Sequence, residues 1–419
     1  MLKYIKVKNF YSFKEETLID FTSDLYGNLK NNVIKEKDTV LNKSLIIYWP
    51  NASWKTNIIK VISFIKYAAL HSFEWWMDFD PFLLDNTSRN KESNFEIGYF
   101  DDWVEYKYGF SIKKWKILKE YLHQITATKD IAIFDRNSKW IVSDNEELYW
   151  KEIAKWEWKV KEWVTLLSVL WQWNAQIDGK PINSFFEKIT ILWNTHYNTE
   201  KTISLLKLNE WKNKESFVYF LKSADINIDD LKIKERKAEL LPFVDVSYFK
   251  KKNIDLDKER IVYDVELWHK KEDWELEYFP LWMESQWTKK LFYILWYIID
   301  TILNEKILFV DEIENNLHVH ILKNLLTLIH WDNWKKYQFI FTTHCVDLMN
   351  LNLFKKSQIG IAQKDKYNST EFYTLADFSE LRAENDVKKL YNIWALWWVP
   401  YVSDLSPLIK SIKLWKKAK

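Results

Sequence analysis

Glycine and cysteine are the residues that this sequence has least of. Only 5 of its 419 residues are glycine, whereas average usage of about 7% would give roughly 29. The single cysteine, Cys345, excludes an internal disulfide and fits a reducing compartment. Charge of one sign is also lacking, because 61 Lys and Arg against 59 Asp and Glu leave a net charge of +2. No strong overall field therefore points to nucleic acid or to an acidic substrate.

Long apolar runs are absent as well. No stretch approaches 18 uninterrupted apolar residues, and residues 1–10 lack the apolar centre of a signal peptide. Hydrophobic residues make up 47% of the chain and charged residues 29%, which is typical of a globular protein and excludes disorder as the main state. We expect a cytoplasmic protein of one large or two modest domains, with no membrane span.

Tryptophan is unusually frequent, and it stands where turns need glycine. The 5 glycines and 26 tryptophans together number 31, close to the glycine content of an ordinary chain of this length. Several tryptophans follow short polar pairs, namely Trp103, Trp115, Trp140, Trp274 and Trp334. Several of these lie between two alternating segments, as in FDDW-VEY and KEDW-ELE. A hairpin needs Asp-Gly or Asn-Gly at such places, because the turn requires a positive φ that a bulky side chain disfavours.

Two explanations account for the tryptophans. One is a tryptophan-rich protein that uses surface rings for binding. The other is that many of these positions are glycine in the natural protein. Some bacteria read the UGA codon as glycine, and translating such a gene with UGA read as tryptophan would give this pattern. We favour the second explanation, and mass spectrometry of the natural protein at Trp54 and Trp103 tests it.

The order of the predicted elements indicates a discontinuous α/β core with an insertion. Apolar runs predict buried strands at 44–48, 307–310 and 338–341, and helical spacing predicts helices at 56–71 and 285–304. Alternating residues at 2–7, 18–21 and 95–133 predict strands and hairpins. We expect an N-terminal half at 1–135, a largely helical insertion at 136–260 and a C-terminal half at 261–419.

A phosphate-binding loop follows the first buried strand. It consists of Trp49, Pro50, Asn51, Ala52, Ser53, Trp54, Lys55, Thr56 and Asn57. With Trp49 and Trp54 read as glycine, residues 49–56 become GPNASGKT. This is a full match to G-x-x-x-x-G-K-[ST] between a strand and a helix. Backbone N–H groups of such a loop hold a β-phosphate, Lys55 pairs with the β- and γ-phosphates, and Thr56 binds Mg²⁺. Two indole rings in the loop would prevent this.

Two further predicted strands end in residues that are typical of a nucleotide site. Asp311 and Glu312 follow the apolar run 307–310. The usual role of the first acid is to hold Mg²⁺ through water, and that of the second is to orient the attacking water as general base. His344 follows the run 338–341 after two threonines and is a candidate for contact with the γ-phosphate. Each signal is weak alone, but together with the loop they form a specific combination.

A third candidate region begins the helix predicted at 285–304. Ser285 is placed as its N-cap, and Trp287, read as glycine, is followed by Thr288. The free N–H groups of such a helix start favour an anion. A plain capped helix explains the same residues without a ligand.

The combination resembles the ABC/SMC-type branch of P-loop ATPases, specifically the stand-alone bacterial AAA-type ATP-binding proteins. These are similar to ATPases of abortive-infection and overcoming-lysogenization-defect systems. The segments that carry the resemblance are IKVKNFYSFKEET, the phosphate loop, PFLLDNTSRNKESNFEIGYF, LSVLWQWNA, ESQWTKKLF, LFVDEIENNLHVHI, FIFTTHCVDLMNL and DFSELRAEND. The resemblance implies a mixed sheet like that of an SMC head, with an antiparallel β subdomain and a helical insertion.

It also implies a composite site in a homodimer that sandwiches ATP and Mg²⁺. Lys55, Thr56, Asp311, Glu312 and His344 would come from one subunit, and Ser285, Trp287 and Thr288 from the other. Residues 315–318 would line the dimer interface, and Gln172 is a candidate glutamine-loop residue. We expect a switch ATPase in phage defence or DNA transactions, with an effector protein encoded nearby or DNA as partner. The alternatives are a non-hydrolysing scaffold protein and a housekeeping DNA-repair ATPase.

Overall fold

The computed structural model describes most of the chain. It covers residues 1–25, 27–48, 56–74, 77, 79–144, 151–177, 180–193, 214–224, 228–237, 261–315, 317–331, 334–378 and 387–388. The phosphate loop at 49–55 and most of residues 379–419 lie outside these ranges. None of the described helices combines the length and the apolar character needed to cross a bilayer.

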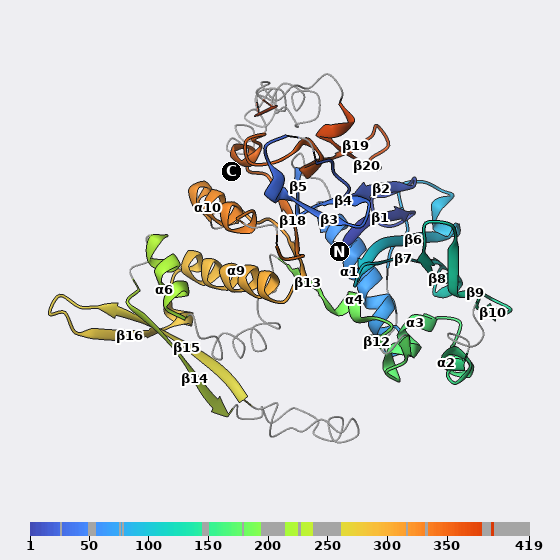
Figure 1. Cartoon of the computed structure of the whole chain (residues 1–419), viewed down its shortest axis with the longest axis horizontal. Coiled ribbons are helices and arrows are strands. Elements are labelled where there is room, and N and C mark those ends of the chain that lie inside the picture. The colour runs from blue at the N-terminus through green and yellow to red at the C-terminus, as the bar shows by residue number, and fades with distance from the viewer. Residues whose placement is uncertain are drawn as a thin grey trace, which may run out of the picture.

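A six-stranded sheet forms the centre of the fold (Figure 1). Its strands, in spatial order, are β13 (Ile189–Leu192), β17 (Ile307–Val310), β18 (Gln338–Thr343), β5 (Ser44–Tyr48), β19 (Ile359–Lys364) and β20 (Thr370–Thr374). The first five run parallel, and β20 is antiparallel to β19. Every residue of β5, β17 and β18 is buried, which confirms the three predicted buried strands.

Alternate side chains of the central sheet enter two separate cores. Leu45 and Ile47 of β5 belong to one core, together with α1 (Thr56–His71). Ile46 and Tyr48 belong to the other, together with α9 (Gln286–Leu303) and α10 (Val319–Ile329). Since successive strand residues point to opposite faces, the sheet is covered on both sides. The mixed α/β class predicted from the sequence is therefore confirmed.

A second, antiparallel sheet packs beyond α1. Its spatial order is β10 (Ile141–Val142), β9 (Asp130–Asn137), β8 (Lys116–Ile125), β7 (Val104–Lys113), β6 (Ser93–Asp101), β1 (Leu2–Lys8) and β2 (Thr17–Asp20). Its buried side chains join those of α1 in the first core. The predicted strands at 2–7 and 18–21 and the hairpins at 95–133 are confirmed as β1, β2 and β6–β9.

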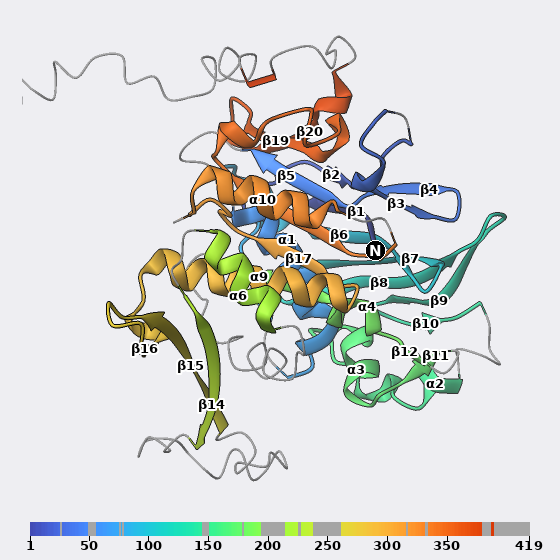
Figure 2. The same ribbon diagram turned by 60° about the vertical axis from the view of Figure 1, so that its left-hand side comes forward.

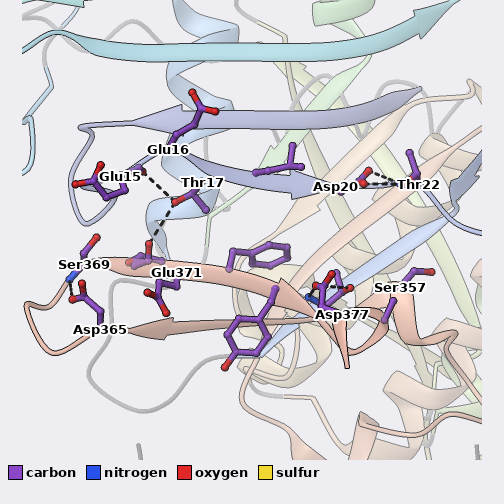
Figure 3. Close-up of a pocket in the computed structure, with 16 residues that line it drawn as sticks. Glu15, Glu16, Thr17, Asp20, Thr22, Ser357, Asp365, Ser369, Glu371 and Asp377 are labelled. Carbon is purple, nitrogen blue, oxygen red and sulfur yellow. Dashed lines mark hydrogen bonds between the residues drawn. The ribbon is translucent and has the colours of Figure 1, made fainter. Parts of the chain in front are cut away.

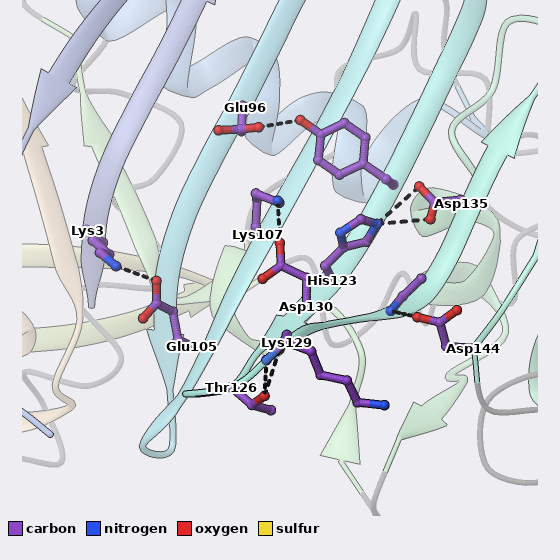
Figure 4. Close-up of polar contacts among 12 residues, drawn as sticks. Lys3, Glu96, Glu105, Lys107, His123, Thr126, Lys129, Asp130, Asp135 and Asp144 are labelled. Carbon is purple, nitrogen blue, oxygen red and sulfur yellow. Dashed lines mark hydrogen bonds and ion pairs between the residues drawn. The ribbon is translucent and has the colours of Figure 1, made fainter. Parts of the chain in front are cut away.

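The polar contacts of the seven-stranded sheet are locally paired (Figure 4). Lys3 contacts Glu105 at 2.5 Å, Lys107 contacts Asp130 at 2.8 Å, and His123 Nε2 lies 3.1 Å from Asp135. A surface that binds a nucleic-acid backbone presents cations to the phosphates. Because the two lysines and the histidine face carboxylates instead, this part of the sheet is not arranged to present cations to phosphates.

The segment 136–260 adds both helices and strands. Its described helices are α2 (Lys151–Ala154), α3 (Leu166–Gln172), α4 (Ser184–Glu187) and α6 (Lys214–Ser223). Its described strands are β10, β11 (Gln176–Ile177), β12 (Lys180–Pro181), β13 and β14 (Asp230–Lys237). β13 pairs with β17 in the central sheet. This segment was expected to be largely helical, but its described part also supplies one strand of the core.

A three-stranded sheet projects from the α9 side of the molecule in both views (Figures 1 and 2). It consists of β14, β15 (Ile261–Lys270) and β16 (Leu276–Pro280). A short hairpin is formed by β3 (Val33–Glu36) and β4 (Thr39–Asn42). The 3-10 helices are Lys30–Asn32, Ser88–Asn90, Glu157–Lys159, Leu281–Met283, Val346–Leu348, Lys356–Gln358 and Leu375–Asp377. The helix at 281–283 leads from β16 into α9.

Two hairpin tryptophans occupy backbone positions that favour glycine. Asp102 and Trp103 form the two-residue turn between β6 and β7, with φ of 45° and 68°. Trp274 has a φ of 70°, and its N–H donates to the Lys271 carbonyl in the β15–β16 turn. Three-residue hairpin loops that end in a left-handed residue normally carry glycine there. The backbone therefore supports the glycine interpretation at Trp103 and Trp274.

The other hairpin tryptophans do not share this geometry. Trp115 and Trp140 have no positive φ, and in the β7–β8 turn it is Lys114 that has a φ of 57°. Trp334 follows residues 332 and 333, which lie outside the described residues. The argument from turn geometry thus holds at Trp103 and Trp274 and does not extend to Trp115 and Trp140.

We expect Trp274→Gly to raise the free energy of unfolding by up to about 1 kcal/mol. The left-handed conformation costs a residue with a side chain about 1–2 kcal/mol. This relief exceeds the loss of the exposed contact between Lys270 Nζ and the Trp274 ring, about 0.5 kcal/mol. Urea unfolding measures the change. Trp158→Gly is the matched control, because Trp158 is equally exposed and has no positive φ. A gain of equal size in the control would contradict the prediction.

Candidate functional site

Three elements bring polar side chains together at the carboxyl edge of the central sheet. Asp311 directly follows β17 and is buried. Its Oδ1 accepts a hydrogen bond of 2.7 Å from the hydroxyl of Thr342 in β18, and its Oδ2 accepts one of 3.2 Å from the hydroxyl of Thr56. Thr56 is the first residue of α1. Residues 255 positions apart in the sequence therefore meet at one carboxylate.

Most of the phosphate loop lies outside the described residues. This applies to Trp49, Pro50, Asn51, Ala52, Ser53, Trp54 and Lys55. The strand before the loop and the helix after it are described, and they confirm the predicted strand–loop–helix order. The side chain of Asn57 is buried, and its Nδ2 donates to Ser12 Oγ at 2.9 Å. One of the two N–H groups of this amide is therefore used within the protein.

Thr56 and Asp311 together are suited to a hard divalent cation. Hydroxyl and carboxylate oxygens are the ligands that Mg²⁺ prefers, and Mg²⁺ commonly keeps water and substrate phosphates as its other ligands. Two protein oxygens are therefore sufficient for a nucleotide-linked site. Among the described residues, no group of three or more His, Cys, Asp and Glu side chains forms a separate metal centre.

Glu312 has an unusual backbone conformation. Its φ is 50°, in the left-handed region that residues with side chains seldom adopt. Its N–H donates to Thr342 Oγ1 at 2.8 Å, so one threonine contacts both predicted acids. Strained conformations of this kind cluster at functional sites. Thr342 was not among the predicted site residues, although its place beside His344 at a strand end was a usable signal.

His344 follows β18 and is hydrogen-bonded to the loop after β17, residues 311–315, which we call the acidic loop. Its backbone N–H donates to Glu314 Oε1 at 2.6 Å. Glu314 belongs to the same loop as Asp311 and Glu312, which it follows by three and two positions respectively. The histidine and the acids therefore lie at the same edge of the sheet, as the sequence predicts for neighbouring parallel strands.

The start of α9 is capped as predicted. The Ser285 side chain accepts a hydrogen bond of 3.0 Å from the N–H of Thr288, which confirms Ser285 as the N-cap. Ser285 is exposed, whereas Trp287 is half-buried against the second core. Thr288 is buried and its hydroxyl contacts Ser285 Oγ. The predicted role of Thr288 in nucleotide binding stays a prediction.

The remaining predicted residues lie elsewhere. Gln172 is the exposed last residue of α3, and no described hydrogen bond links it to Thr56 or Asp311. Asn315 donates its N–H to the Glu312 carbonyl at 3.0 Å, and His318 is the N-cap residue of α10. Residue 316, between them, lies outside the described residues.

A large cleft lies away from these residues (Figure 3). Its volume is about 590 Å³, and it lies where β2 and β20, the outer strands of the two sheets, face each other. The carboxylates that line it are Glu15, Glu16, Asp20, Asp365, Glu371 and Asp377. Such a lining repels a triphosphate. This cleft is therefore not the nucleotide site.

Part of the C-terminal half matches a known family of AAA domains. Residues 267–350 match the family described as "AAA domain, putative AbiEii toxin, Type IV TA system". This segment includes Ser285, Asp311, Glu312 and His344. This match confirms the resemblance to AAA-type proteins of abortive-infection systems that was drawn from the sequence. A comparison with curated proteins gave no match.

Solved structures of SMC heads are similar to this chain. The head domain from Thermotoga maritima shares 14% identity at a TM-score of 0.40, covering 89% of this chain and 98% of the other. A head bound to the C-terminal winged-helix domain of ScpA shares 11% identity at a TM-score of 0.42, covering 89% and 97%. A third structure is a head with an extended coiled coil, bound to the C-terminal domain of ScpA and derived from Pyrococcus furiosus. It shares 11% identity at a TM-score of 0.43, covering 94% of this chain and 99% of the other.

Proposed function

We propose that this chain is a Mg²⁺-dependent ATPase that works as a nucleotide-driven dimeric switch. The observation that carries the proposal is the meeting of Thr56 and Thr342 at the Asp311 carboxylate. A threonine at the start of the helix after a phosphate loop and an acid at a neighbouring strand end are the two cation ligands of a P-loop ATPase. The match of residues 267–350 to an AAA domain supports the same class.

Each residue then has a role in binding and positioning. Lys55 pairs with the β- and γ-phosphates, and Thr56 and Asp311 hold Mg²⁺, which neutralises the charge that develops on the phosphates. Thr342 fixes the Asp311 carboxylate by donating to Oδ1. Glu312 accepts a proton from the attacking water as general base. His344 contacts the γ-phosphate and responds to its loss.

The exposed start of α9 supports the proposed dimer. In the proposal, Ser285 and the backbone at Trp287, as glycine, face the γ-phosphate bound by a second copy, so that ATP closes the dimer and hydrolysis reopens it. The family description names a toxin of a toxin–antitoxin system, which favours phage defence over housekeeping repair. We propose a cytoplasmic protein that acts with an effector encoded nearby. DNA as a partner has weaker support, since the net charge is only +2.

We expect ATP turnover only when residues 49 and 54 are glycine. The full chain with glycine at 49, 54 and 287 should hydrolyse ATP, whereas the chain with tryptophan should not, because indole rings block the approach of backbone N–H groups to phosphate. Phosphate release measures turnover, and Trp158→Gly alone is the control. The absence of hydrolysis in the glycine-containing chain would favour the non-hydrolysing scaffold. The codons of the source gene give an independent check.

A further inference from the structure

The amino group of Lys290 is buried beside the acidic loop. Lys290 lies near the start of α9, and its side chain is only 6% exposed. Its Nζ donates a hydrogen bond of 2.9 Å to the backbone carbonyl of Glu312. Burial lowers the pKa of Lys290 to about 8, against the opposing effect of the nearby Glu314, Glu312 and Asp311 carboxylates. Burying a cation is unfavourable, so this contact requires an explanation.

The peptide groups of Glu312 are held on both sides. The Thr342 hydroxyl accepts a hydrogen bond from the Glu312 N–H. The Glu312 carbonyl accepts hydrogen bonds from Lys290 Nζ and from the N–H of Asn315. Between these contacts the backbone has its left-handed φ of 50°. Such a conformation persists only where surrounding groups determine it. Because φ sets the direction in which the side chain leaves the backbone, the contacts also fix where the Glu312 carboxylate points.

Lys290 joins two parts of the site that are distant in the sequence. It is five residues beyond Ser285, the N-cap of α9, and twenty-two before Glu312. A helix of 18 residues moves as a rigid element. A shift of the α9 start therefore displaces Lys290 Nζ relative to the carbonyl that it contacts.

We infer that Lys290 is a positioning residue that couples the start of α9 to the direction of the Glu312 carboxylate. The inference rests on the proposed function, in which Glu312 acts on the attacking water. Lys290 contacts the peptide carbonyl and not the substrate. Its effect therefore falls on the chemical step rather than on the affinity for ATP.

Kinetics of Lys290→Met test this role in the full chain with glycine at 49, 54 and 287. We expect kcat to fall roughly 10- to 100-fold, because a misplacement of about 1 Å at a catalytic group has an effect of this size. KM should change less than about 3-fold, since Lys290 is not placed at the phosphates. Lys290→Arg, which keeps a charged donor, should restore part of kcat.

Lys289→Met is the matched control, because it removes the same charge from the neighbouring position of the same helix. It should leave kcat nearly unchanged. The thermal midpoint of Lys290→Met should equal or exceed that of the parent, because a buried charge is replaced by an apolar side chain. An unchanged kcat in Lys290→Met, an equal loss in Lys289→Met, or a loss accompanied by a lower midpoint would overturn the inference.

Hydrogen exchange separates this inference from the proposed ATPase. In the nucleotide-free chain with tryptophan at 49 and 54, peptides covering 307–317 should exchange faster in Lys290→Met and not in Lys289→Met. If the glycine-containing chain does not hydrolyse ATP but this difference appears, the contact stands and the ATPase proposal fails. If the exchange of these peptides is the same in both variants, the inference fails, whatever the turnover.

Discussion

Glu312→Gln is expected to reduce ATP turnover about 100-fold or more while leaving ATP binding intact. A general base contributes roughly 10²- to 10⁴-fold to rate, and glutamine cannot accept the proton. The substitution preserves the size of the side chain, and the hydrogen bonds that hold residue 312 involve backbone groups. Phosphate release gives the turnover, and a filter-binding assay gives the affinity for ATP, in the chain with glycine at 49, 54 and 287.

Glu305→Gln provides a close control for this experiment. Glu305 is also in the left-handed region, with a φ of 51°, but it is exposed and follows the end of α9. The ATP turnover of Glu305→Gln should remain within about 2-fold of that of the parent chain, as expected for a surface substitution away from the site. Retention of more than about one tenth of the activity by Glu312→Gln would assign the general base to another group.

Glu120→Ala is expected to have the largest effect on stability, a loss of about 3–5 kcal/mol in the free energy of unfolding. Glu120 in β8 is fully buried and contacts Arg136 Nη1 at 3.1 Å. It also accepts from the N–H groups of Leu166 and Leu167 at the start of α3, and from the Tyr108 hydroxyl. Burial raises the pKa of Glu120, and Arg136 opposes this effect. Removal of the carboxylate leaves the buried Arg136 without its counter-charge, although it still donates to the Val164 and Lys161 carbonyls, and leaves two N–H groups unsatisfied.

Urea unfolding measures this effect, with Asp130→Ala as the control. Asp130 also pairs with a cation, Lys107, but the aspartate side chain is 48% exposed, and exposed pairs contribute about 0–1 kcal/mol. The two variants therefore differ in the burial of the ion pair that is removed. If the loss in Glu120→Ala were no larger than in Asp130→Ala, water would reach the Glu120 site in the folded state.

The parts of the fold that depend on local pattern could be predicted from the sequence. The runs at 44–48 and 307–310 are apolar at every position, which indicates strands covered on both faces. The helix at 56–71 and the Ser285 cap depend on spacing and on one side chain. These signals are contained in a few consecutive residues, so tertiary packing did not have to be known.

The contacts between distant residues could not be predicted in the same way. The entry of β13 into the central sheet depends on a pairing with β17, 118 positions later. The burial of Asn57 against Ser12 and the contact of Lys290 with the Glu312 carbonyl likewise join separate elements. Residue type alone does not distinguish Lys290 from Lys289, because only the rotation of α9 decides which amino group is buried.

The strand order of the central sheet also determines when it can form during synthesis. β5 pairs only with β18 and β19 in the described sheet, and Leu2 exchanges hydrogen bonds with Gln338, 336 positions away. At about 5–20 residues per second, the ribosome takes tens of seconds to make the missing partners. Throughout that time the apolar segment SLIIY has unpaired backbone groups. The nascent chain is thus most prone to aggregation before β18 is translated, and chaperones would act in that interval.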